Sequence, residues 1–305
     1  MNASYSVALR LAFTFKIIRK TMKLTISIII LLNSFALLGQ ISDYGCKTES
    51  HNLLSKDGQE YIIKVTLPRN YDSQKEYETL YYLDSWWLSE LVLGTYAILN
   101  LSEKIDDVVL IGISLNGNLK DWNIQRTMDF TPSEYNMGFE MKAGKGENGI
   151  SLNKSNTGGA DIFIDFIETK IFKLIELKYP SIGENRTLMG HSYGGLFSLY
   201  TIQRKSKLFS NYIIISPSLW WNNSELLKME LFYAFEQSKT SNSIYLCYGN
   251  SESKLISKSN TKVDIILSGL EKEKLDYKFK VFNETNHNSI LPQGIYKGLL
   301  YTYRK

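Results

Sequence analysis

The chain reads Arg186-Thr187-Leu188-Met189-Gly190-His191-Ser192-Tyr193-Gly194-Gly195-Leu196-Phe197-Ser198-Leu199-Tyr200 at the stretch that decides its fold. The pattern Gly190-x-Ser192-x-Gly194 follows a short apolar run, and apolar residues recur at helical spacing beyond it. A buried strand, a tight turn and a helix in this order are typical of a nucleophile elbow, which presents a serine hydroxyl. The alternative is an ordinary glycine-rich turn, because the bare pattern often arises by chance. The candidate partners of Ser192 described below favour the elbow.

The glycines of this turn have a steric role. In an elbow the strand and the helix nearly touch two residues on either side of the serine, so only small residues fit there. Gly190, Gly194 and Gly195 meet that requirement. We expect the turn to raise the Ser192 hydroxyl above the sheet and to direct the N–H of Tyr193 at a reacting carbonyl.

Length and charge limit the class of protein. The 305 residues suit one large α/β domain of roughly 250 residues with an extension. The formal net charge is +4, but residues 1–40 hold five basic residues and no acidic ones, which leaves 30 basic and 31 acidic residues in the remainder. The basic balance therefore belongs to the leader, and nucleic acid is not expected as a partner.

The leader is typical of an export signal. Met22-Lys23 opens a basic region, and an apolar run follows over residues 24–38. Fifteen residues suit the core of a signal peptide and are short for a membrane-spanning helix. We expect Met22 to be the true start and the mature protein to be periplasmic or secreted, with no stable membrane insertion after cleavage. The alternative is an uncleaved membrane anchor.

Cysteine and histidine are scarce. Cys46 and Cys247 could pair in an oxidising compartment, but nothing in their spacing demands a disulfide. Three histidines at scattered positions do not have metal-ligand spacing, so neither a metal nor another cofactor is expected. The oligomeric state cannot be predicted from the sequence.

Strands and helices are expected to alternate along residues 41–305. We predict strands over residues 61–67, 79–83, 108–113, 212–215, 243–248 and 277–282, and helices over residues 88–101, 161–179, 225–236 and 263–275. This alternation predicts a single α/β-hydrolase domain with a doubly wound, mostly parallel sheet, and the turn at Lys56-Asp57-Gly58 predicts antiparallel strands at its N-terminus. Residues 114–158 show little periodicity and form a candidate lid or substrate loop.

A serine nucleophile needs a base, and the base needs an acid that orients it. In this fold the order along the chain is serine, acid, histidine. Because His51 and His191 come no later than the elbow, His287 is the remaining candidate base. Glu252, just beyond a strand end, is the first candidate acid. Glu284, or no essential acid at all, is the alternative.

The loops after the strands supply the other candidate groups. An oxyanion hole needs two backbone N–H groups, for which we predict Tyr193 and Trp86, with Ser85 as the second choice for the latter. All tryptophans follow predicted strand ends, where ligands bind in open α/β sheets: Trp86, Trp87, Trp122, Trp220 and Trp221. These rings either line the site and favour a bulky acyl group, with Trp86, Trp220 and Trp221 as substrate contacts, or merely cap the core.

Several segments together resemble the putative-esterase branch of the α/β-hydrolases. They are Leu80-Tyr81-Tyr82-Leu83-Asp84, Arg126-x-x-Asp129-Phe130-Thr131-Pro132, the helix over residues 158–179, the elbow, and Ser216-Pro217-Ser218-Leu219-Trp220-Trp221. The resemblance covers residues 47–303 and is greatest to esterases that open trilactone siderophores of the enterobactin and bacillibactin type. It implies a Ser–His centre and places Arg126 near an anionic substrate. The alternative for Arg126 is a structural pair with Asp129.

The sequence therefore predicts a serine carboxylic-ester hydrolase that acts on a small-molecule ester through an acyl-enzyme. Two departures from the resemblance keep alternatives open. Ser85 stands where the family usually has glycine, and Tyr193 replaces the commoner leucine. A hydrolase-like binding protein without catalysis is one alternative, and an acyltransferase of the same fold is the other.

Overall fold

The computed structural model describes residues 40–41, 44–115, 117–135, 151–179, 185–205, 207–228, 242–270 and 275–305. The predicted export signal and its start at Met22 lie outside these residues. Among the residues that are described, no helix is long and apolar enough to cross a membrane.

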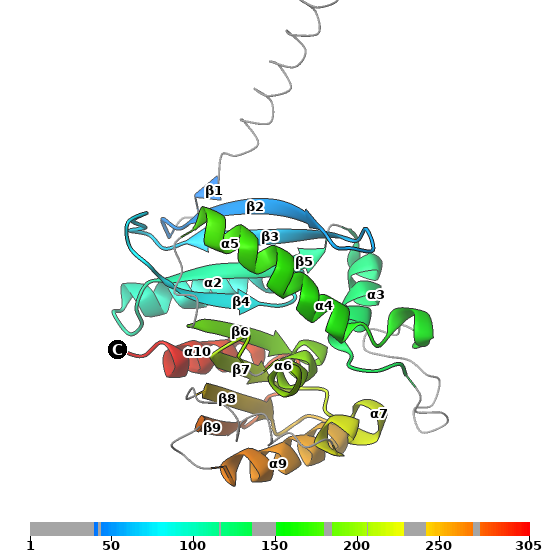
Figure 1. Cartoon of the computed structure of the whole chain (residues 1–305). Coiled ribbons are helices and arrows are strands. Elements are labelled where there is room, and N and C mark those ends of the chain that lie inside the picture. The colour runs from blue at the N-terminus through cyan, green and yellow to red at the C-terminus, as the bar shows by residue number, and fades with distance from the viewer. Residues whose placement is uncertain are drawn as a thin grey trace, which may run out of the picture. The chain divides into compact units, whose positions relative to one another are not determined.

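A mixed sheet forms the centre of residues 41–305 (Figure 1). Within the described residues its strand order is β1-β2-β3-β5-β4-β6-β7-β8-β9. The strands are β1 (Gln40–Ile41), β2 (Lys47–Leu54), β3 (Glu60–Leu67), β4 (Glu78–Tyr82), β5 (Val108–Leu115), β6 (Arg186–His191), β7 (Asn211–Ile215), β8 (Asn242–Gly249) and β9 (Leu275–Phe282). β3 pairs antiparallel with β2 and with β5, and every pairing from β5 to β9 is parallel. The predicted mostly parallel sheet with antiparallel N-terminal strands is confirmed.

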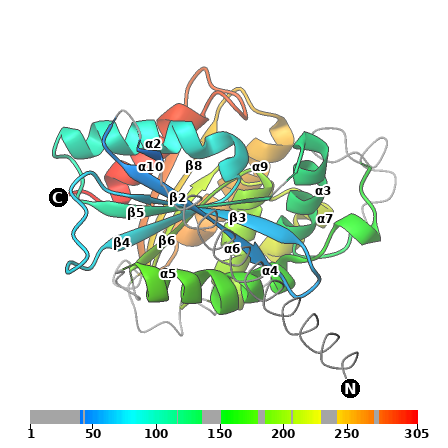
Figure 2. The same cartoon turned by 90° about the horizontal axis from the view of Figure 1, so that it is seen from above.

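Helices cover both faces of this sheet, which is why the central strands are buried along almost their whole length. All eight residues of β5 are buried. One face carries α2 (Ser85–Leu101) and α10 (Leu291–Thr302), and the other carries α4 (Ala160–Phe166) and α5 (Phe172–Lys178), joined by a π-helical turn (Figure 2). α6 (Tyr193–Arg204) and α9 (Lys254–Ser268) pack into the same core as α4 and α5.

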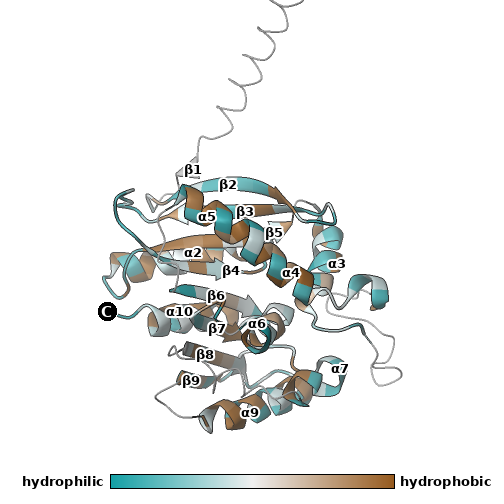
Figure 3. Cartoon of the chain, viewed as in Figure 1, coloured by the Kyte–Doolittle hydropathy of each residue, from teal (hydrophilic) through white to brown (hydrophobic). Residues whose placement is uncertain are grey.

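The prediction that residues 114–158 lack regular structure is wrong for their first part. α3 (Leu119–Phe130) forms there, capped by the side chain of Asn118, which accepts from two backbone N–H groups. Its buried face is largely polar and therefore leaves no hydrophobic period in the sequence. Figure 3 shows α3 mainly in the hydrophilic colour. Most of the remaining candidate lid, residues 136–150, lies outside the described residues.

Three further helical segments also differ from the prediction. α9 begins at Lys254, nine residues earlier than predicted, where the Ser253 side chain caps its N-terminus. The segment predicted as a helix over residues 225–236 starts as a 3₁₀ turn, Glu225–Lys228, and its remainder lies outside the described residues. α10 was not predicted, because glycines at positions 294 and 298 weaken its helical pattern.

The two cysteines are free thiols. Cys46 and Cys247 are both buried in the core that lies between the sheet and the helices α2 and α10. Burial raises the pKa of both thiols and keeps them protonated.

Candidate active site

The elbow forms at the junction of β6 and α6. Ser192 has φ 61° and ψ −118°, a backbone conformation that residues other than glycine rarely adopt. A Cβ atom at Gly190 would lie 2.1 Å from the carbonyl oxygen of Gly194, so this position requires glycine. The strand and the helix approach as closely as the sequence pattern predicts, and Ser192 sits at the point of the turn.

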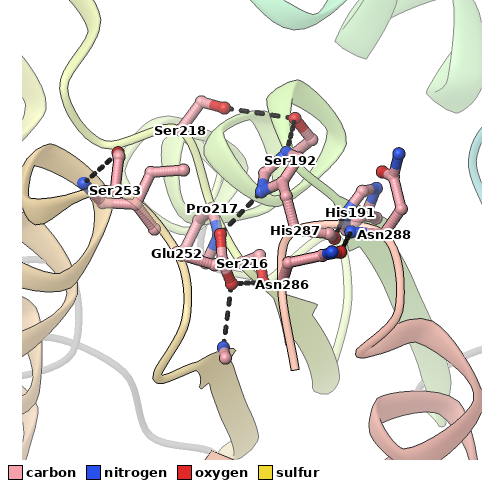
Figure 4. A network of polar contacts seen from close by, with 12 residues as sticks. His191, Ser192, Ser216, Pro217, Ser218, Glu252, Ser253, Asn286, His287 and Asn288 are labelled. Carbon is pink, nitrogen blue, oxygen red and sulfur yellow. Dashed lines mark hydrogen bonds and ion pairs between the residues drawn. The ribbon is translucent and has the colours of Figure 1, made fainter. Parts of the chain in front are cut away.

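The Ser192 hydroxyl is the first member of a hydrogen-bonded chain of three side chains (Figure 4). Its Oγ lies 2.8 Å from Nε2 of His287, and Nδ1 of His287 lies 2.7 Å from Oε2 of Glu252. His287 comes from the loop between β9 and α10, and Glu252 lies three residues beyond the end of β8. Residues far apart in the sequence thus meet at the carboxyl edge of the parallel strands.

The Glu252 carboxylate is fully buried and held by donors on both oxygens. Oε2 contacts His287, while Oε1 accepts from the hydroxyl of Ser216 at 2.5 Å and from the N–H of Gly249 at 2.8 Å. Burial alone would raise the pKa of Glu252, but these hydrogen bonds outweigh it and lower the pKa. The carboxylate is therefore ionised and suited to orient His287. The alternative acid, Glu284, is exposed on the loop that carries His287.

Two contacts at this site were not predicted. Nε2 of His191 lies 2.7 Å from the backbone carbonyl oxygen of His287, and because a carbonyl only accepts, Nε2 is the donor. Oγ of Ser218 lies 3.2 Å from Oγ of Ser192. The adjacency of His191 to the elbow was visible in the sequence, but its partner lies 96 residues away along the chain.

A cavity of about 460 Å³ opens beside Ser192 and His287. Among its lining residues are Trp86, Trp87 and Trp122, and the rings of Trp86 and Trp122 stack with centroids 5.6 Å apart. Trp86 is 43% exposed, so much of its ring is available to a ligand. Three of the five tryptophans thus line the cavity beside the proposed nucleophile.

Trp220 and Trp221, which were also predicted as substrate contacts, do not line this cavity. Both rings are buried in the core, and the ring of Trp221 meets that of Tyr193 edge to face at 5.7 Å. The turn after Pro217 directs them inward, where a large apolar ring gains more from burial than from exposure.

The structural partner predicted for Arg126 is also wrong. Its guanidinium binds Asp84 through two parallel hydrogen bonds, Nε to Oδ1 and Nη2 to Oδ2, both at 2.9 Å. Asp129 instead accepts from the hydroxyl of Tyr61 at 2.8 Å. The Arg126–Asp84 pair is buried, although Arg126 also reaches the wall of the cavity.

The N-termini of two helices lie at this site. Tyr193 is the first residue of α6, and Ser85 and Trp86 begin α2. The first N–H groups of a helix have no intrahelical acceptor, and the helix dipole favours negative charge near them. The N–H groups of Trp87 and Leu88 are already bonded to the carbonyl of Asp84. Those of Ser85 and Trp86 remain the candidates on α2 for an oxyanion.

The sequence matches the family described as Putative esterase over residues 55–289, more than three quarters of its length. The chain belongs to this family. Its fold is that of the α/β-hydrolases, and the predicted family and fold are confirmed.

Among curated proteins, the chain is similar to siderophore esterases. It is 34% identical over 117 residues to the siderophore triacetylfusarinine C esterase of Aspergillus fumigatus, covering 38% of this chain and 34% of the relative. It is 31% identical over 149 residues to the ferri-bacillibactin esterase of Bacillus subtilis, covering 47% and 52%. The chain thus spans about a third to a half of the length of these two relatives.

Solved structures match over a greater length. The BES protein of Bacillus cereus has a TM-score of 0.76 and 26% identity, with 87% of this chain and 97% of that chain covered. A siderophore hydrolase of Aspergillus nidulans has a TM-score of 0.68 at 23% identity, covering 83% and 93%, and this likeness concerns the fold alone.

Proposed function

We propose that the protein is a serine carboxylic-ester hydrolase that works through an acyl-enzyme. The observation that carries the proposal is the continuous chain from Ser192 through His287 to the buried carboxylate of Glu252. Membership of the Putative esterase family supports it. A nucleophile within hydrogen-bond distance of a base, which is itself oriented by an acid, is the arrangement that such catalysis requires.

Each group then has a defined role. Nε2 of His287 takes the Ser192 proton as Oγ attacks the ester carbonyl, and the negative oxygen that forms accepts hydrogen bonds from the N–H groups of Tyr193 and Trp86. The carbonyl re-forms as His287 protonates the departing alcohol, which leaves an acyl-enzyme. Water, deprotonated by His287, attacks the acyl carbonyl. The bond between the acyl carbon and Oγ of Ser192 then breaks as His287 returns the proton to Oγ, and the acid leaves. Glu252 stabilises the imidazolium in both halves.

We further propose that the substrate is a bulky aryl ester of the siderophore type. The stacked rings of Trp86 and Trp122 form a flat apolar wall beside the nucleophile, suited to a second aromatic ring. Several relatives are named for siderophore ester hydrolysis. Turnover of a catecholate trilactone, a feruloyl sugar and a short acyl ester should be compared, and kcat/KM should be highest for the trilactone.

Ser192→Ala tests the mechanism. Turnover of p-nitrophenyl acetate should fall by about 10⁴-fold or more in kcat, and covalent labelling by a fluorophosphonate should disappear. Near-normal turnover in this variant would remove the proposed nucleophile. A wild-type protein that neither labels nor turns over any ester would instead be a binding protein. Product analysis with an added acceptor alcohol distinguishes hydrolysis from acyl transfer.

We propose that the protein is exported, on the basis of the basic region at Met22-Lys23 and the apolar run that follows it. The N-terminal sequence of the mature protein, determined from the host cell envelope and from the medium, tests this. A mature chain that still begins at residue 1 or 22 would contradict cleavage.

A further inference from the structure

A second cavity, of about 600 Å³, lies between the sheet and α10. It is lined by Tyr245 of β8, by Lys278 and Lys280 of β9, and by Lys297, Leu300, Tyr301 and Arg304 of α10 and the residues after it. It shares no lining residue with the cavity beside Ser192. Its size suits a small molecule or a head group.

The fold brings four cationic side chains together here. Lys278 and Lys280 are two residues apart on a strand and therefore project from the same face of β9. Lys297 lies on α10 and Arg304 follows the end of that helix, and both side chains line the cavity. Tyr245 lies opposite Lys278 in the parallel register, and its ring is tilted by 44° against that of Tyr301 on the helix, with centroids 5.8 Å apart.

Most of this charge is not neutralised. Within the part of the chain that is described, no carboxylate lies within ion-pair distance of Lys278, Lys280 or Lys297. Arg304 contacts Asp276 at 3.3 Å, and that carboxylate also accepts from the Tyr301 hydroxyl at 2.6 Å. Four cations around one carboxylate leave a positive potential in the cavity, which attracts an anion.

The Tyr245 hydroxyl provides a second, independent observation. Tyr245 is 1% exposed, and the partner of its hydroxyl is the buried thiol of Cys247. A thiol is only a weak hydrogen-bond partner, so this buried hydroxyl still lacks a strong acceptor. The charged groups lining the cavity are ammonium and guanidinium donors, and Tyr301 donates to Asp276, so this wall lacks a free anionic acceptor. An anion in the cavity would supply one.

We propose that this cavity binds a phosphate-bearing ligand with at least two negative charges. Lysine ammonium groups are compact point charges suited to phosphate oxygens, and the Arg304 guanidinium and the Tyr301 ring provide a flat wall for an attached group. The phosphate belongs either to a soluble polyphosphate-like molecule or to a lipid head group. The site lies apart from the proposed catalytic centre and does not depend on it.

Isothermal titration of the full chain with sodium tripolyphosphate at about 0.15 M salt tests the charge cluster. The wild-type protein should bind saturably, and the triple variant Lys278→Gln/Lys280→Gln/Lys297→Gln should bind at least tenfold more weakly. Tyr245→Phe leaves the charge unchanged and removes only the hydroxyl. It should weaken binding about fivefold without lowering the melting temperature.

A matched control removes the same number of charges elsewhere. Lys254, Lys258 and Lys262 are exposed on α9 and contribute to neither cavity. Their joint replacement by glutamine should change tripolyphosphate affinity less than twofold. p-Nitrophenyl acetate turnover should be the same in the wild-type protein and in all variants, which shows that each is folded.

The source of the phosphate is determined by a vesicle assay. A lipid head group is assigned if the wild-type protein co-sediments with vesicles containing phosphatidic acid but not with phosphatidylcholine vesicles. The triple variant of Lys278, Lys280 and Lys297 should then lose this binding, and the triple variant of the α9 lysines should retain it. Tripolyphosphate binding without vesicle binding would assign a soluble ligand. The proposal is overturned if neither probe binds, if the two triple lysine variants weaken binding equally, or if Tyr245→Phe binds as tightly as the wild type.

Discussion

Replacing Arg126 by methionine should destabilise the whole domain and should not selectively affect anionic substrates. Its guanidinium is held by two 2.9 Å bonds to Asp84, and the two side chains are 4% and 0% exposed. Asp84 is also the residue that precedes α2, with φ 57°, so its orientation sets the entry of the helix whose first N–H groups face the site. Breaking the pair therefore affects stability and catalysis together.

The size of the effect follows from burial. Removing one member of a buried ion pair leaves the other charge uncompensated and costs about 3–5 kcal/mol. For a domain of this size, that corresponds to a fall in melting temperature of roughly 6–20 °C. Arg204 and Asp161 form a pair of nearly identical geometry, with bonds of 3.0 and 3.0 Å, but their side chains are 51% and 55% exposed. Arg204→Met should cost at most about 1 kcal/mol.

The assay combines denaturant unfolding with ester kinetics. Arg126→Met should lower kcat/KM for a neutral and for an anionic aryl ester by the same factor. Asp84→Asn keeps a residue that tolerates positive φ, and the double variant should lose less stability than the two single changes added together. A loss confined to the anionic ester, with unfolding unchanged, would refute this reasoning and restore Arg126 as a substrate contact.

Three further predictions concern single side chains. Glu252→Gln should lower kcat about 10²–10⁴-fold. Every group facing the carboxylate is a donor, so an amide must turn its own N–H₂ toward one of these donors. A pH–rate profile with unchanged kcat would contradict this prediction. Asp129 is fully buried, and burial raises its pKa to about 7. Its contribution to stability is therefore full below about pH 4 and is lost as the pH rises through 7. The free energy of unfolding of Asp129→Asn should rise relative to that of the wild type by up to about 1.4 kcal/mol per pH unit across that range. Denaturant titrations at each pH measure this difference. His191→Phe removes the donor to the His287 carbonyl and should lower kcat with little change in KM. His191→Gln can still donate and should restore part of the lost kcat. A rise in KM as large as the fall in kcat would indicate that His191 binds substrate instead.

The sequence predicted best those features that depend on backbone geometry and chain order. The elbow needs small residues at fixed positions, so glycine marks it directly. The proposed base and acid were located because parallel strands end at one edge, where His287 and Glu252 follow their strands. Their mutual distances agree with that prediction, although their catalytic roles stay predictions.

The features that sequence missed depend on pairs of polar groups far apart in the chain. α3 buries the polar residues Asn123, Arg126 and Asp129. Without knowledge of their partners, the sequence of this helix is typical of a loop. Asp84 lies 42 residues from Arg126, and no local pattern marks the contact. α10 was hidden for the opposite reason. Its glycines lower helix propensity, yet a Cβ at Gly298 would lie 2.4 Å from a side-chain carbon of Ile213, so the helix packs closely on β7 only because they are there.

The segment Ser216-Pro217-Ser218 connects the proposed nucleophile to the proposed acid. The Ser216 hydroxyl donates to Glu252, while the N–H of Ser218 donates to the carbonyl of Ser192 at 3.0 Å. Ser216 itself has φ 45°, a strained conformation that aims its hydroxyl at the carboxylate. Two strained serines at the ends of adjacent strands are thus joined by hydrogen bonds through one short turn. A shift of this turn would therefore move Ser192 and Glu252 together, so the turn sets the position of the proposed nucleophile relative to the proposed acid.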